Sequence, residues 1–262
     1  MSMMDKLFDP GRDAALVTGA GNGIDRAIAQ ALVGEGVRTV FADVRPDTIA
    51  AAVAASPRPE LAVPWVGDLS NHDTWEALLA DARSAVGLVT HFVHSAAPQR
   101  READHIFAVT DETWRQMHAV NIDAGFHLAR ELARQLIAAR APGSFLMLTS
   151  LHAGTPRNLP HYSTSKAALA ILVKELAKTL GRFGIRVNAL VPGAIAAGGF
   201  VAHPAIARHI PLGRLGRSED LAPMALAVLS NRAAGYVTGA EIVVDGGISL
   251  TNWFDPPALD DL

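Results

Sequence analysis

The chain of 262 residues contains no cysteine, few aromatic side chains and no excess of basic residues. The absence of cysteine excludes disulfides, thiolate metal ligands and a cysteine nucleophile. A net charge of −3 argues against a basic face for nucleic acid. Hydrophobic runs stay well short of the ~18–20 residues of a membrane span, and the first residues lack the apolar core of a signal peptide. We therefore expect a soluble, cytoplasmic protein that binds neither nucleic acid nor membranes.

Histidine is a common metal ligand, and the chain contains ten of them. No His-Glu-x-x-His pattern occurs among them. His91 and His94 are three apart on an expected strand, so their side chains face opposite sides and cannot chelate one ion together. The sequence therefore predicts no catalytic metal.

Short β-branched runs alternate with longer helical patterns along the whole chain. The expected strands are 14–18, 37–42, 61–66, 89–94, 144–149, 186–190 and 241–244, and the expected helices are 26–33, 46–55, 73–85, 111–139, 161–180 and 218–229. This alternation predicts an α/β fold with a doubly wound parallel sheet (Rossmann fold) in a single domain, residues 1–262. Pro64 predicts that the third strand lies at an edge, as in the order 3-2-1-4-5-6.

A glycine-rich turn, Thr18–Ile24, follows the first expected strand and precedes a helix. Such a turn lets the backbone approach a pyrophosphate at the helix N-terminus. Asp43 ends the second strand ~20 residues further on, where a carboxylate accepts the ribose hydroxyls of NAD and repels the 2′-phosphate of NADP. We expect NAD for this reason, although Arg45 offers NADP a phosphate partner. Asp25 stands where the pattern has a third glycine, either as a first-turn residue favoured by the helix dipole or as a charge that weakens cofactor binding.

Tyr162 and Lys166 are four residues apart at the start of the most apolar expected helix, so both side chains project from one helix face. A nearby ammonium favours the phenolate form of a tyrosine, which makes Tyr162 a candidate general acid/base. A serine, Ser150, ends the preceding strand. These residues, together with the glycine turn, indicate a dinucleotide-dependent enzyme.

The chain resembles the short-chain dehydrogenase/reductase family over almost its whole length. The resemblance rests on the glycine turn, on Tyr162 and Lys166, and on the segments 67–69, 120–122, 148–150, 191–195, 210–214, 236–239 and 245–247. It implies that Tyr162 exchanges the proton with the substrate oxygen and that Lys166 supports it and binds the nicotinamide ribose. It also implies that Ser150 bonds the substrate oxygen and that Asn121 holds a water that links Lys166 to solvent.

The resemblance also implies a full set of cofactor contacts. The implied cofactor-binding residues are Gly19, Gly21, Asn22, Gly23, Ile24, Asp43, Asp68, Leu69, Ser95, Ala96, Tyr162, Lys166, Pro192, Gly193 and Ile195. Besides Asp25, two features depart from the family pattern. The segment 94–97 reads His-Ser-Ala-Ala where Asn-Asn-Ala-Gly is typical, so the side chains that join the central sheet must differ. Ser150 precedes Tyr162 by one residue fewer than is usual, which leaves Thr149 as an alternative hydroxyl.

We expect an NAD-dependent oxidoreductase that transfers a hydride to or from a small sugar, polyol or other hydroxy compound. The alternatives are an NADPH-dependent reductase similar to 3-oxoacyl-carrier-protein reductases and a non-catalytic dinucleotide-binding protein. Residues 196–211 are the expected substrate-side lid, and His152, His161 and the loop 98–104 are candidates for the pocket wall. The helix around 167–173 is apolar on every side, so we expect a second subunit to cover it, and the resemblance implies a homotetramer or homodimer. A monomer covered by its own C-terminal tail, 249–262, is the alternative.

Overall fold

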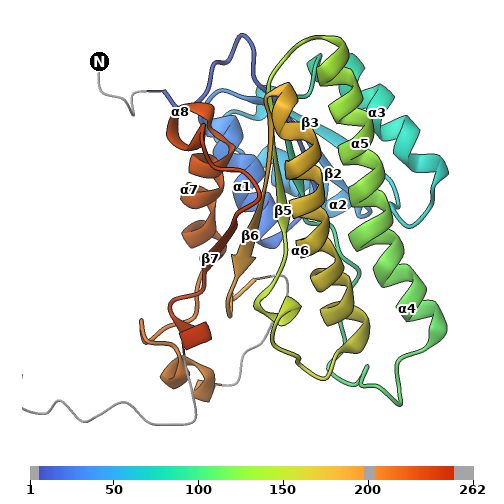
Figure 1. The fold of residues 1–262 in the computed structure, drawn as a ribbon, viewed down its shortest axis with the longest axis vertical. Helices are drawn as coiled ribbons and strands as arrows, with labels where there is room; N and C mark the ends of the chain where they lie inside the picture. The colour runs from blue at the N-terminus through green and yellow to red at the C-terminus, as the bar shows by residue number, and fades with distance from the viewer. Residues whose placement is uncertain (1–5, 198–203, 251–262) are drawn as a thin grey trace, which may run out of the picture.

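The computed structural model describes residues 6–197 and 204–250 and contains one seven-stranded parallel sheet (Figure 1). The strand order is β3-β2-β1-β4-β5-β6-β7, and every pair is parallel. The strands are β1 (Ala14–Thr18), β2 (Arg38–Asp43), β3 (Ala62–Val66), β4 (His91–His94), β5 (Gly143–Leu148), β6 (Ile185–Pro192) and β7 (Glu241–Val244). The predicted Rossmann fold and all seven predicted strands are confirmed.

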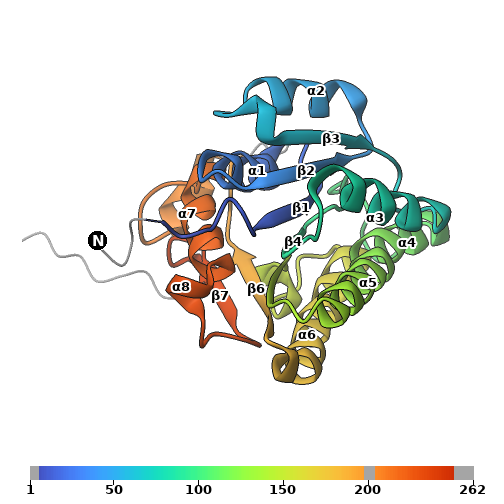
Figure 2. The ribbon, with the colours of Figure 1, turned by 90° about the horizontal axis from the view of Figure 1, so that it is seen from above.

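Helices cover both faces of this sheet (Figure 2). They are α1 (Gly23–Gly34), α2 (Pro46–Ala54), α3 (Asp73–Val86), α4 (Asp111–His118), α5 (Gly125–Ala138), α6 (Pro160–Leu180), α7 (Ser218–Leu229) and α8 (Asn231–Ala234). Buried residues of α1, α2 and α7 share one core cluster, and those of α3, α5 and α6 share the other. A parallel sheet needs such cover on both faces because its strands are apolar on both sides.

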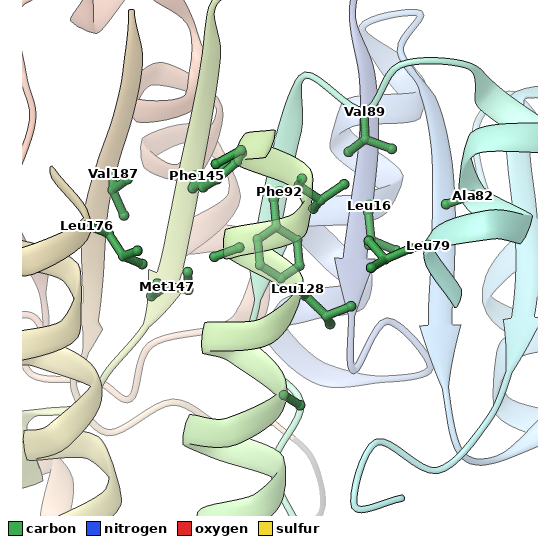
Figure 3. Close-up of a cluster of buried hydrophobic side chains, with 14 of the residues drawn as sticks. Leu16, Leu79, Ala82, Val89, Phe92, Leu128, Phe145, Met147, Leu176 and Val187 are labelled. Atoms are coloured by element: carbon green, nitrogen blue, oxygen red, sulfur yellow. The ribbon is translucent and has the colours of Figure 1, made fainter. Parts of the chain in front are cut away.

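The larger core cluster lies between the sheet and α3, α5 and α6 (Figure 3). Phe92 of β4 and Phe145 of β5 meet edge to face with ring centroids 5.8 Å apart, and Leu128 of α5 is wholly buried in the same cluster. Burying a side chain of this size contributes about 1.5–3 kcal/mol. This packing holds the central strands rigidly, and the ends of those strands carry the site residues.

The third strand is an edge strand, as Pro64 predicts. It pairs with β2 alone in the described sheet, with Pro64 opposite Phe41, and Pro64 itself is exposed. A proline at this position removes a donor that a central strand would need.

The prediction of one regular helix over 111–139 is wrong in its middle. Thr110 caps α4 by accepting a hydrogen bond from the amide of Thr113 (3.1 Å). The chain then continues through a π-helical turn, Ala119–Ala124, before α5 begins. Such wide turns occur often at functional sites, and this one contains Asn121.

Helix α6 keeps one apolar side chain exposed. Leu169, Ala170 and Val173 are buried, but Ile171 is 57% exposed. The tail proposed to cover this helix lies, apart from 249–250, outside the described residues, as does the middle of the expected lid, 198–203. Among the described helices, none has both the length and the hydropathy required to cross a bilayer.

Candidate active site

The carboxyl ends of the parallel strands form the edge where open α/β sheets bind ligands. The predicted site residues end or follow β1, β2, β3, β4, β5 and β6 at this edge. The order of the strands reverses between β1 and β4. The turn after β1 and the segment after β4 therefore border the crevice.

The turn after β1 has a conformation that glycine adopts with little strain. Gly19 and Gly23 have φ angles of 79° and 63°. The Gly21 amide donates a hydrogen bond to Asp43 Oδ2 (3.1 Å), and a Cβ on Gly21 would stand 2.8 Å from that oxygen. Asn22 is the N-cap of α1 but makes no side-chain hydrogen bond there. No capping side chain therefore occupies the first amides of the helix, which include the amide of Ile24. A dinucleotide pyrophosphate fits this turn, because free amides and the helix dipole attract anions.

Asp43 is fixed at the end of β2. Its Oδ2 accepts the Gly21 amide, and its Oδ1 accepts the Arg45 amide (3.1 Å). The Arg45 side chain lies 3.7 Å from the same Oδ1. Next to it, Asp68 is exposed after β3 and accepts the Ser70 amide (2.8 Å), while Leu69 is buried. The structure thus brings the two carboxylates of the expected adenosine side to neighbouring strand ends.

Asp25 turns its carboxyl group toward the glycine turn. Its Oδ2 lies 2.8 Å from where a Cβ of Gly19 would be, and Oδ1 is buried without a hydrogen-bond partner among the described residues. Burial raises the pKa of Asp25 to about 7, against a side-chain hydrogen bond with Ser95 and the charge of Lys166, which both lower it. Asp25 is therefore a buried group of the cofactor turn and titrates near neutrality.

His94 joins the sheet where the family pattern has asparagine. Its Nδ1 lies 3.0 Å from Thr18 Oγ1, and that hydroxyl accepts the amides of Ser95 (3.2 Å) and Ala96 (3.4 Å). The hydroxyl hydrogen then points to Nδ1, so Nε2 carries the ring proton and donates to the Asn121 carbonyl (3.2 Å). Burial, followed by the charge of Lys166, lowers the pKa of His94 to about 4. A neutral imidazole thus connects the glycine turn to the π-helical turn.

Tyr162 and Lys166 meet at the start of α6, as their spacing predicts. Lys166 Nζ donates to the Leu148 carbonyl at the end of β5 (2.7 Å) and lies 5.8 Å from the centre of the Tyr162 ring. Both side chains are buried, with 4% and 7% of their surface exposed. Burial lowers the pKa of Lys166, whereas the charges of Tyr162 and Asp25 oppose that change.

The two candidate hydroxyls after β5 have different surroundings. Thr149 donates its hydroxyl to the Leu190 carbonyl of β6 (3.3 Å). Ser150 accepts the His152 amide (3.2 Å) and keeps its own hydroxyl hydrogen for another acceptor. Only the second hydroxyl is left to bond a ligand.

Asn121 is wholly buried in the π-helical turn. Its Nδ2 donates to Ser165 Oγ (2.8 Å), which donates in turn to the Tyr162 carbonyl (2.8 Å). Its Oδ1 has no partner among the described residues. The link through Ser165 was not predicted, although a serine three residues after Tyr162 is well placed to bond back to that turn of the helix.

Pro192 is the last residue of β6, and Gly193 and Ile195 follow it at the same edge of the sheet. The Gly193 amide donates to Val244 of β7 (3.1 Å), and a Cβ on Gly193 would stand 2.6 Å from Asp245. Glycine is therefore needed for this close crossing. The bridge between Ile195 and Gly216 fixes the chain beyond it.

The candidate pocket residues divide into two kinds. His161 is wholly buried, with Nε2 3.9 Å from Asp104 Oδ2, so it does not present its ring to an open pocket. His152 is partly exposed and lies 6.4 Å from the Tyr162 ring, with Nδ1 bonded to Thr155. Arg100, from the loop after β4, lies over the face of Tyr162. Across residues 6–197 and 204–250, no three metal-ligating side chains gather in one place.

Comparison with known proteins agrees with this geometry. The family described as Enoyl-(Acyl carrier protein) reductase matches residues 19–249. Galactitol 2-dehydrogenase (L-tagatose-forming) of Cereibacter sphaeroides is 34% identical over 247 residues, 90% of this chain and 94% of the relative. The mouse (3R)-3-hydroxyacyl-CoA dehydrogenase is 32% identical over 253 residues, 90% and 96% of the two chains.

A solved structure extends the likeness to the whole fold. The short-chain type dehydrogenase/reductase from Mycobacterium marinum superposes with a TM-score of 0.86 at 28% identity and covers 95% of this chain and 100% of its own. The strand order, the paired Tyr162 and Lys166 and these matches lead to one conclusion. The chain belongs to the short-chain dehydrogenase/reductase family of oxidoreductases.

Proposed function

We propose that this oxidoreductase transfers a hydride between NAD and the alcohol or carbonyl carbon of a small polar substrate, with Tyr162 as general acid/base. The observation that carries the proposal is the grouping of Tyr162, Lys166 and the free hydroxyl of Ser150 beside the glycine turn. These are a proton carrier, a cation that supports it and a donor for the substrate oxygen, all at the cofactor edge of the sheet.

In the oxidation direction, the nicotinamide supplies the hydride acceptor. Ser150 holds the substrate hydroxyl by a hydrogen bond, and the phenolate of Tyr162 takes the hydroxyl proton as the carbonyl forms. The Lys166 ammonium stabilises the phenolate. One alcohol and one oxidised cofactor thus give one carbonyl compound, one reduced cofactor and one proton.

The proton must then leave Tyr162 for solvent. Asn121 supports a path, because its buried Oδ1 has no protein partner in the described structure and a buried amide oxygen needs one. We infer that Asn121 holds a water that connects Lys166 to solvent. His94 fixes the Asn121 backbone and thereby the place of that water.

The cofactor choice follows from Asp43. Its carboxylate stands at the end of β2, where it would accept ribose hydroxyls and repel a 2′-phosphate. Asp68 and Leu69 would border the adenine, the segment Ser95–Ala96 the middle of the cofactor, and Pro192, Gly193 and Ile195 the nicotinamide. Arg45 lies within ion-pair distance of Asp43, which leaves less positive charge for a phosphate.

The relatives suggest two substrate classes for this site. Galactitol 2-dehydrogenase favours a sugar or polyol as substrate. The mouse (3R)-3-hydroxyacyl-CoA dehydrogenase and the family description both name an acyl carrier, which favours the second candidate, an NADPH-dependent reductase similar to 3-oxoacyl-carrier-protein reductases. For the assembled protein we propose a cytoplasmic homotetramer or homodimer of single-domain subunits, with residues 196–211 as the substrate-side lid.

Spectrophotometry with purified protein tests the proposal. Polyols, sugars and hydroxy acids are offered with NAD or NADP, and 3-oxoacyl thioesters with NADH or NADPH, while absorbance of the reduced cofactor is followed. The expected result is NADH formation with a polar alcohol and a higher kcat/KM for NAD than for NADP. Turnover of the thioesters alone with NADPH supports the second candidate. Cofactor binding without turnover of any substrate indicates a non-catalytic binding protein.

A further inference from the structure

The side chain of Arg100 lies directly against Tyr162, the proposed general acid/base. Its Cζ lies 4.4 Å from the centroid of the Tyr162 ring, over the face of that ring. The residue is exposed and comes from the loop that follows β4. An arginine stacks well on an aromatic face because its guanidinium is flat and weakly hydrated. The contact holds the charged group at the mouth of the site.

The charge of Arg100 has no acidic partner in the part of the chain that the structure describes, whereas Arg157 nearby is paired with Glu102 (2.7 Å). Asp104, the other acid of this loop, accepts the Arg101 amide (3.3 Å) and lies 3.9 Å from His161. Both acids of the loop are therefore engaged elsewhere. The guanidinium keeps its hydrogen-bond donors for a ligand.

Arg100 adds a positive charge beside the phenol, where the Lys166 ammonium also lies. Burial is the main cause of the lowered pKa of Lys166, His152 and His161, and the charge of Arg100 lowers all three further. These groups come from the loop after β4, the segment after β5 and helix α6. The charges of Asp25, Glu102 and Asp104 act in the opposite direction on Lys166, His152 and His161, in that order. The attraction for an anion at Tyr162 therefore comes from the two cations that contact its ring, Arg100 and Lys166.

We propose that Arg100 determines substrate specificity by binding an oxyanion of the substrate, a carboxylate or a phosphate, close to the carbon that is oxidised. A guanidinium presents a flat pair of N–H donors that matches the two oxygens of either group. Since it lies on the ring of Tyr162, only a short molecule can reach both Arg100 and the phenolic oxygen. The substrate class is then a short hydroxy acid or a small hydroxyalkyl phosphate.

This inference rests on the proposed function, which supplies the hydroxyl partner at Tyr162, and it deepens the expectation of a sugar, polyol or hydroxy compound. A neutral polyol gains nothing from a guanidinium that it could not gain from a neutral donor. An anionic substrate gains a charge-assisted pair of hydrogen bonds. Anionic and neutral molecules of the same shape therefore distinguish the two cases.

The test compares matched pairs of substrates in the wild type and in Arg100→Gln, Arg100→Lys and Arg182→Gln. The pairs are 3-hydroxybutyrate with its amide, galactonate with galactitol, and glycerol 3-phosphate with glycerol. We expect the wild type to favour the anionic member of at least one pair by about tenfold or more in kcat/KM, mainly through KM. Arg100→Gln should bring this ratio close to one and Arg100→Lys should restore part of it. Arg182→Gln is the matched control, because it removes an exposed arginine that lies on the ring of Phe183 beyond the C-terminal end of α6, and it should leave the ratio unchanged.

The pair that responds identifies the oxyanion, since the first two pairs carry a carboxylate and the third a phosphate. A binding measurement keeps the inference testable if none of the six is a substrate. Isobutyrate and inorganic phosphate, with isobutyramide as neutral control, are titrated calorimetrically into the enzyme with NADH. Binding of an anion that is lost in Arg100→Gln supports the inference.

An equal anion-to-neutral ratio in wild type and Arg100→Gln, or no anion binding in the wild type, would overturn the inference about Arg100. Turnover of the neutral members alone would leave the proposed oxidoreductase function intact. Absence of turnover with all alcohols, sugars and thioesters would instead contradict the proposed function. The two failures are thus distinguishable.

Discussion

At the scale of single residues, the phenol of Tyr162 is the group on which the proposed chemistry depends. Tyr162→Phe removes the proton carrier but leaves the glycine turn and the ring that packs in the site. General acid/base catalysis contributes roughly 10²–10⁴-fold to the rate, so kcat should fall by at least about a hundredfold while NADH affinity changes little. Steady-state kinetics and a fluorescence titration with NADH measure the two. A variant that keeps more than about a tenth of the wild-type kcat would show that another group carries the proton.

The buried carboxyl of Asp25 should make the stability of the protein depend on pH. Burial raises its pKa in the folded chain to about 7 from the ordinary value of 3.8, so the folded state binds the proton more tightly than the unfolded state does. The stabilisation by protonation is complete below about pH 4 and is lost as the pH rises through 7. The full difference is at most about 4 kcal/mol, because one pKa unit corresponds to about 1.4 kcal/mol.

Asp25→Asn keeps the shape of the side chain and removes its titration. We expect the variant to gain stability relative to wild type as the pH increases from 5 to 8 in urea unfolding of the cofactor-free protein. Asp47→Asn, which changes an exposed first-turn carboxylate of α2, is the matched control and should leave the profile unchanged. NAD affinity should also fall less steeply above pH 7 in Asp25→Asn, because a buried negative charge next to the pyrophosphate is absent. Parallel pH profiles for wild type and Asp25→Asn would mean that Asp25 does not titrate in this range.

At the scale of elements, the hydrophobic periodicity of the sequence predicts where strands and helices lie but not the irregular turns within them. The strands agree within two residues at each end, because β-branched runs bounded by turns are specific to buried parallel strands. The π-helical turn around Asn121 was not predicted, since one additional residue in a turn hardly changes the apolar pattern. The orientation of Asp25 does not follow from the sequence either, because a first-turn side chain can point to solvent or to the glycine turn with the same spacing.

The join between β4 and α5 illustrates the same limit. The replacement of asparagine by His94 predicts a different connection in the sheet but does not say which element accommodates the larger ring. The structure places Gly125, the first residue of α5, against the imidazole. A Cβ on Gly125 would stand 2.7 Å from His94 Cδ2 and 2.8 Å from Nε2. The absence of a side chain at Gly125 therefore leaves room for the imidazole of His94.

Gly125→Ala should consequently destabilise the protein although alanine favours a helix by up to about 1 kcal/mol. The imidazole cannot move away easily because both of its nitrogens are engaged, and overpacking of this kind costs about 1–3 kcal/mol. In the background of His94→Asn the same substitution should cost less or become favourable. Urea unfolding of the four proteins in this double-mutant cycle measures the coupling. A cost that does not depend on residue 94 would contradict the proposed contact.

At the scale of the whole molecule, α5 and α6 leave an apolar groove on one face of the domain. Phe126, Ile137, Leu172 and Leu176 line it, together with charged side chains at its border. Ile171 of α6 and Phe126 of α5 are 57% and 40% exposed. Neighbouring exposed apolar side chains on two long helices are typical of an interface between proteins. Figure 2 shows α5 and α6 in one helical layer on the outside of the sheet. We propose this surface as the interface of the expected homotetramer or homodimer.

Ile171→Glu tests this assembly, because it places a charge on the exposed apolar side of α6, next in the chain to the groove residue Leu172, and burial of an unpaired charge in an interface is costly. We expect sedimentation velocity to show a smaller assembly for Ile171→Glu than for wild type, with an unchanged far-UV circular dichroism spectrum. Met224→Glu on α7, a side chain 41% exposed in the other helical layer, is the matched control. If Met224→Glu leaves the wild-type mass unchanged while Ile171→Glu lowers it, the α5–α6 face holds a dimer together. A tetramer that falls to a dimer with either variant requires a second interface in the α7 layer. A wild type that is dissociated by Met224→Glu and not by Ile171→Glu would place the assembly on α7 and leave the α5–α6 groove without a subunit to cover it.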